Sequence, residues 1–145
     1  MLGKKVVKTI TLTSFILICF LGNGAWGSPM IFVSETGEDS LSGIFTIYPG
    51  HNIKQLDIFC MGSLKPTRHL DPRYPDPKIK LLIKTPSITF KKEYDPNSSG
   101  YVQGRVPLPR EFLYHGKWEI EARWEGSSSG NAITLQVEGL TPFNN

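Results

Sequence analysis

The alternation of apolar and charged residues over Lys117–Glu125 constrains the fold more than any other feature of the chain. One side of an extended strand would carry Trp118, Ile120, Ala122 and Trp124, and the other Glu119, Glu121, Arg123 and Glu125. A period of two over nine residues is typical of a strand that buries one face and exposes the other. The pattern predicts a β-sheet, with both tryptophans in the core rather than forming a sugar-stacking surface.

Other segments of the chain also resemble short strands separated by turn residues. The expected strands are Pro29–Val33, Leu41–Tyr48, Ile53–Met61, Lys78–Lys84, Ile88–Tyr94, Tyr101–Leu108 and a last one containing Ile133, Leu135 and Val137. Gly37–Ser40 and Gly126–Asn131 are expected turns, and Pro109–His115 is an expected helical turn. No sustained helical period occurs. The sequence therefore predicts an all-β, immunoglobulin-like antiparallel β-sandwich of seven to eight strands.

The first 27 residues have the pattern of an export signal. Three lysines precede a 12-residue apolar run, Ile10–Leu21, and small residues at Ala25 and Gly27 suit a signal-peptidase cut before Ser28. The run is shorter than the roughly 20 residues that a membrane-spanning helix needs. We expect residues 1–27 to be a signal peptide and residues 28–145 to be one β-sandwich domain. The domain would be periplasmic or secreted, without a stable membrane span after cleavage.

Charge and cysteine content limit the function further. Three of the 16 basic residues lie in the signal, whereas all 13 acidic residues lie after it, so the exported part is formally neutral. This balance disfavours a nucleic-acid binder. Basic residues are concentrated between His51 and Lys92, either as a local positive face or as charge scattered over exposed strands. Cys60 would be the only cysteine after cleavage, so no internal disulfide is expected.

A proline-rich segment, residues 62–77, is the first candidate for recognition. Its four prolines exclude a regular strand and would stiffen the loop. The candidate partner-binding residues are Lys65, Arg68, His69, Arg73 and Tyr74. Their cations and aromatic ring would suit an acidic partner surface or an anionic glycan. The alternative is a solvated connection between the sheets.

Soft-metal ligands suggest a second candidate site. Cys60, His51 and His69 are residue types that bind copper, and the end of a strand could bring them to one rim. The alternative is a buried core cysteine with exposed histidines. No cofactor other than copper is suggested. The sequence also lacks a nucleophile elbow, a zinc-protease helix and a phosphate-binding glycine loop, so we expect no enzymatic activity.

The carboxy-terminal half resembles YtkA-like and FixH-like exported domains. The similarity rests on Gly100-Tyr101, Leu108-Pro109 and the segment Gly116–Ala122, which contains a Gly-x-Trp strand. The resemblance implies an extracytoplasmic immunoglobulin-like module associated with metal handling or the assembly of respiratory complexes. It transfers no functional residue, because the matching positions are core positions.

Together these features predict an exported, non-catalytic accessory module that binds a protein partner in the cell envelope. The first alternative is a periplasmic copper-handling protein of YtkA-like type. The second is a surface carbohydrate-binding or adhesive subunit.

Overall fold

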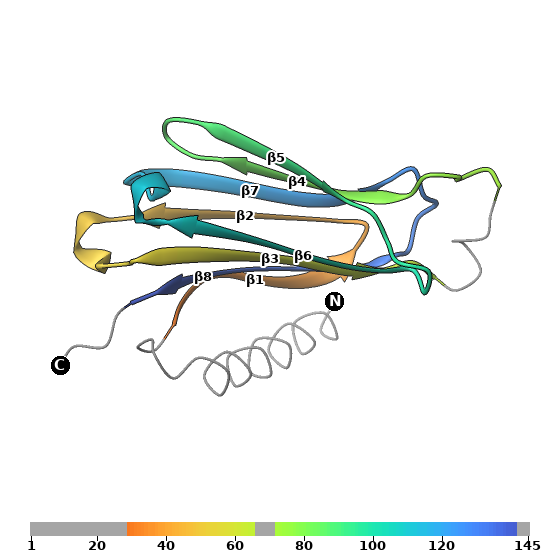
Figure 1. Cartoon of the computed structure of the whole chain (residues 1–145), viewed down its shortest axis with the longest axis horizontal. Coiled ribbons are helices and arrows are strands. Elements are labelled where there is room, and N and C mark those ends of the chain that lie inside the picture. Colours follow the sequence, from red (N-terminus) through yellow and green to blue (C-terminus); the bar gives the residue numbers. More distant parts are fainter. Residues whose placement is uncertain (1–28, 66–71, 142–145) are drawn as a thin grey trace.

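The structure is a computed structural model, and it describes residues 29–65 and 72–141. These residues form two four-stranded antiparallel sheets packed face to face (Figure 1). The first sheet has the order β1 (Met30–Glu38), β8 (Ala132–Leu140), β3 (Gln55–Ser63) and β6 (Tyr101–Pro109). The second has the order β2 (Ser40–Ile47), β7 (Gly116–Glu125), β4 (Lys78–Lys84) and β5 (Thr89–Tyr94). The predicted fold class, an all-β antiparallel sandwich of seven to eight strands, is confirmed, and the described residues form eight strands.

Two short 3₁₀ helices cap one end of the sandwich, η1 (Pro49–His51) and η2 (Arg110–Phe112). The second lies within the segment expected to form a helical turn. No helix among the described residues has the length and apolar character that a membrane crossing requires.

The core lies between the sheets and follows the period-two pattern of the strands. In β7, Trp118 is fully buried and Trp124 nearly so, while the alternate charged residues face outward. The indole of Trp118 donates a hydrogen bond to the carbonyl of Tyr114 (2.8 Å), and that of Trp124 donates to the carbonyl of Ala132 (2.9 Å). Because each buried N–H has a partner, the two large rings fill the core without an unpaired donor. The prediction that both tryptophans are core residues is confirmed.

The strand bounds differ most from expectation at the first corner. The sequence predicted a strand ending at Val33 and a turn over Gly37–Ser40, whereas β1 continues to Glu38 and pairs with β8 as far as Ala132. The chain then passes to the other sheet through Asp39 alone, at a φ of 65°. Pairing with a distant strand has overridden the local preference of glycine, serine and aspartate for turns.

Candidate functional site

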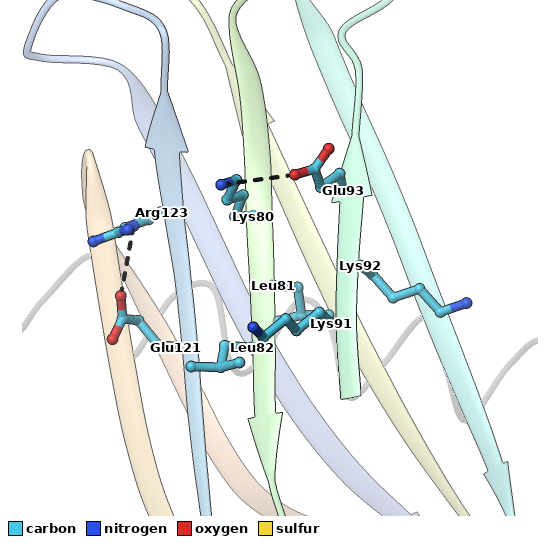
Figure 2. Close-up of a pocket in the computed structure, with 8 residues that line it drawn as sticks. All are labelled: Lys80, Leu81, Leu82, Lys91, Lys92, Glu93, Glu121 and Arg123. Atoms are coloured by element: carbon cyan, nitrogen blue, oxygen red, sulfur yellow. Dashed lines mark ion pairs between the residues drawn. The ribbon is translucent and has the colours of Figure 1, made fainter. Parts of the chain in front are cut away.

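The strongest candidate site is a groove on the outer face of the β2-β7-β4-β5 sheet, formed by β4, β5 and β7 (Figure 2). It encloses about 380 Å³. Its lining residues are Lys80, Leu81, Leu82, Lys91, Lys92, Glu93, Glu121 and Arg123. Leu81 faces the core, and in Figure 2 Lys92 points away from the other side chains. The outward-facing residues are therefore the ones that a ligand would meet.

Leu82 lies at the centre of this groove because of the strand register. Leu82 pairs with Lys91 of β5 on one side and with Glu121 of β7 on the other. Lys80 and Lys84 precede and follow it on the same face of β4, since side chains alternate along a strand. An apolar side chain is thus surrounded by three lysines and one glutamate. We call Lys80, Leu82, Lys84, Lys91 and Glu121 the Leu82 cluster.

Ion pairs connect the charged side chains on one side of the groove. Lys80 Nζ lies 2.9 Å from a carboxylate oxygen of Glu125 and 3.7 Å from one of Glu93. Arg123 lies 2.7 Å from Glu125 and 3.8 Å from Glu121. The hydrogen bond with Glu125 raises the pKa of Lys80, and the same bond lowers the pKa of Glu125, so both remain charged over a wide pH range.

Two lysines of the Leu82 cluster are available to a ligand. Among the residues that the structure describes, Lys84 and Lys91 form no ion pair, although both lie on the outer face of the sheet. A ligand anion at Leu82 would therefore not need to displace an existing carboxylate from either ammonium group. This half of the groove is the part best suited to negative charge.

A second hollow of about 220 Å³ extends the groove across the sheet toward β2. It shares Leu82 and Glu121 with the first and adds Ser42, Ile44, Lys84 and Glu119 among its lining residues. The two hollows together form one path over all four strands. Such a path suits an elongated ligand better than a compact one.

Sequence reasoning missed the groove, although one signal for it was present. In Lys78–Lys84 the apolar residues at 79, 81 and 83 face the core, so the outward positions should all be polar. Leu82 breaks that rule, because it is an apolar residue in an outward position. From the sequence, the lysines of this strand are compatible with either a local positive face or charge scattered over exposed strands.

The structure describes three of the five candidate residues of the proline-rich loop, and two of them, Arg73 and Tyr74, contact each other. The backbone N–H of Lys65 donates to the side-chain oxygen of Asn131 (3.2 Å), and the guanidinium of Arg73 lies over the ring of Tyr74 at 5.8 Å from its centre. Arg68 and His69 lie outside the described residues. Recognition by this loop remains a prediction.

The copper ligands proposed from the sequence lie in different surroundings. Cys60 is completely buried, and burial raises the pKa of its thiol to about 12. His51 belongs to η1, where its ring packs near Phe32 and Tyr48. Cys60 lies five residues beyond Gln55, the first residue of β3. This is roughly 16 Å along the extended strand from the end of β3 that follows η1. His69 lies outside the described residues, and no group of three potential ligands occurs within the described part. Copper binding remains a prediction.

No protein-family model matches the chain, and no curated protein is similar to it in sequence. The resemblance to YtkA-like and FixH-like domains therefore remains a prediction.

Solved structures with similar folds do exist. TmCBM61, in complex with β-1,4-galactotriose, is 13% identical with a TM-score of 0.44, over 85% of this chain and 78% of that one. The family GH115 4-O-methyl-α-glucuronidase BtGH115A is 10% identical with a TM-score of 0.36, over 83% of this chain and 17% of that one. Latent PorU from Porphyromonas gingivalis is 9% identical with a TM-score of 0.37, over 78% of this chain and 13% of that one. The chain is a β-sandwich domain with distant structural similarity to a carbohydrate-binding module.

Proposed function

We propose that the protein is an exported, non-catalytic module that binds an acidic polysaccharide in the groove of the β2-β7-β4-β5 sheet. The observation that carries the proposal is the Leu82 cluster, in which three lysines and one glutamate surround an apolar side chain.

The chemistry of this cluster suits a sugar that bears a carboxylate. The ammonium groups of Lys84 and Lys91 can pair with a uronate, and the carboxylate of Glu121 can accept hydrogen bonds from hydroxyl groups. Leu82 offers an apolar surface for the C–H groups of a sugar ring. Because these side chains stand on a paired sheet, few backbone groups need to be ordered on binding.

Two other ligand classes fit the groove less well. The centre of a protein interface is usually built around aromatic or arginine anchors that lose their water, whereas this groove has no aromatic lining residue and its arginine, Arg123, is already paired with Glu125. A neutral sugar held by ring stacking would need an aromatic ring in the groove, but no aromatic residue lines it, and Trp118 and Trp124 are in the core. Binding would therefore depend on charge and hydrogen bonds.

Affinity electrophoresis and calorimetry with two polymers test the proposal. We expect the protein to bind polygalacturonate, an acidic polymer, and to bind neutral β-1,4-galactan weakly or not at all. Lys91→Glu should weaken binding to polygalacturonate at least tenfold, because it reverses the charge beside Leu82. Lys54→Glu makes the same charge change outside the groove and serves as the matched control.

Three outcomes would overturn the proposal. The first is no binding to polygalacturonate. The second is equal binding to the neutral galactan. The third is an equal loss of binding in the Lys91→Glu and Lys54→Glu variants. Thermal melting of each variant verifies that it is folded.

A further inference from the structure

We propose that the free edge of β2 pairs with β2 of a second copy of this chain. The pairing would be antiparallel about a two-fold axis and would join two β2-β7-β4-β5 sheets. It does not rest on the glycan proposal, since it uses the backbone edge of the sheet instead of the lysines of the Leu82 cluster, although Ser42 and Ile44 also line the second hollow.

The argument begins with the four strands at the edges of the sheets. β6 carries Pro107 and Pro109, β5 carries Lys91 and Lys92, and β1 carries two glutamates and an irregular register between Ile31 and Val33. Prolines, charges and bulges are the usual features that prevent an edge strand from pairing with another chain. β2 has the sequence SLSGIFTI, with no charged residue and no proline. It is the only strand at an edge of either described sheet without such protection.

The alternation of hydrogen bonds between β2 and β7 shows which backbone groups of β2 are available to a second strand. The N–H of Trp124 donates to the carbonyl of Asp39 (2.8 Å), and the β2–β7 register continues from this pair without a shift. In an antiparallel ladder, hydrogen-bonded and non-hydrogen-bonded pairs alternate. The odd-numbered residues of β2 therefore bond to β7. The N–H and C=O groups of Ser42, Ile44 and Thr46 point to the side where no described strand pairs with β2.

The side chains on this edge suit pairing with an identical strand. Ile44 is 65% exposed, the most exposed of the large apolar residues that the structure describes. A register with Ile44 opposite Ile44 of the second copy also places Ser42 opposite Thr46. This gives one apolar cross-strand pair and two hydroxyl pairs, which are favourable combinations. A two-fold axis brings identical strands together, so a charged edge would place like charges near each other. β2 avoids this repulsion.

The expected dimer is weak. A single strand pair buries less than the roughly 1,200 Å² at the lower end of stable interfaces. We therefore expect a dissociation constant of about 10 to 500 µM, and a dimer that is populated only at high protein concentration.

Sedimentation equilibrium between about 5 and 500 µM tests the proposal. We expect concentration-dependent dimerisation, weakened at least tenfold by Ile44→Lys. Ser42→Pro should have the same effect, because its N–H points away from β7 and the change leaves the ladder within the chain intact. Ile88→Lys is the matched control, since Ile88 is also an exposed isoleucine, 37% exposed and just before β5.

A protein that remains monomeric at the highest concentration would overturn the proposal. A dimer that persists in both β2 variants, or one that Ile88→Lys weakens equally, would also overturn it. Circular dichroism of each variant separates lost association from lost folding. Because Ser42 and Ile44 also line the second hollow, the glycan proposal is tested separately, by polygalacturonate binding of the wild type at concentrations where it is monomeric.

Discussion

The carboxylate of Asp39 accepts hydrogen bonds from the backbone N–H of Gly130, at 2.8 and 2.7 Å to its two oxygens. The two residues are 91 positions apart in the chain. Asp39 also accepts from the N–H of Asn131 at 3.0 Å, while its own N–H donates to the carbonyl of Asn131. The corner where the chain changes sheets is thus bonded to the turn between β7 and β8. One acidic side chain links the beginning and the end of the sandwich.

We therefore expect Asp39→Ala to destabilise the protein by about 1–3 kcal/mol. The change removes the carboxylate that accepts hydrogen bonds from two backbone N–H groups, those of Gly130 and Asn131, and puts a side chain that disfavours positive φ at 65°. Urea denaturation measures the loss. Asp39→Asn tolerates the same φ and keeps one acceptor oxygen, so it should lose less. Equal losses in the two variants would contradict this account of the corner.

A second prediction concerns the contact between Gly104 of β6 and Tyr94 of β5, which lie in opposite sheets. A Cβ on Gly104 would lie 2.6 Å from atoms of the Tyr94 ring. Gly104→Ala should therefore lower the free energy of unfolding by about 1–3 kcal/mol through overpacking. Gly50→Ala, where a Cβ meets nothing within 4 Å, is the control and should change stability little. In the double variant Gly104→Ala/Tyr94→Ala, the loss should be less than the sum of the single losses.

The period-two pattern was sufficient to predict most of the fold. Charged and apolar residues alternate strictly in β7, so the burial of Trp118 and Trp124 followed from local spacing. The same alternation places Leu56, Ile58 and Cys60 on one face of β3, and all three are buried in the core. These assignments need no knowledge of which strands are neighbours.

Features that depend on neighbouring strands could not be predicted in this way. The extension of β1 to Glu38 requires its pairing with β8, about a hundred residues away. The Leu82 cluster requires the registers of β4 with both β5 and β7, since its members come from three strands. The sequence showed the lysines of the cluster, but it did not show that three of them surround one half-buried, outward-facing leucine.

The buried thiol of Cys60 predicts how stability changes at alkaline pH. Burial raises the pKa of the thiol from 9.0 to about 12 in the folded protein. Below pH 9 the thiol keeps its proton in both states, so it has no effect on stability. Between pH 9 and 12 the unfolded chain releases this proton and the folded protein retains it. Stability should then fall by about 1.4 kcal/mol per pH unit from this group.

Urea denaturation between pH 8 and 10.5 measures this slope in the wild type and in Cys60→Ala. The variant should show a smaller loss of stability over the interval, because one proton release has been removed. Other groups titrate in both proteins, so only the difference between the slopes is informative. Identical slopes would show that Cys60 is not held protonated in the core.

Burial of Cys60 also bears on the copper alternative. Copper binds the thiolate form of cysteine, and forming it here would require a charge in the core. Titration with Cu(I) under anaerobic conditions should therefore give the same affinity for the wild type and for Cys60→Ser. Loss of binding tighter than micromolar in the variant would instead support copper binding through Cys60.

The last prediction is the salt dependence of glycan binding. Lys84 and Lys91 form no ion pair among the described residues, so their attraction to a uronate should be screened by added salt. Binding to polygalacturonate should weaken at least tenfold between 50 and 500 mM NaCl. Lys84→Gln should reduce this salt dependence, because one of the two cations is removed, whereas Lys54→Gln should leave it unchanged. Binding that is insensitive to salt would mean that the lysines around Leu82 do not hold the ligand.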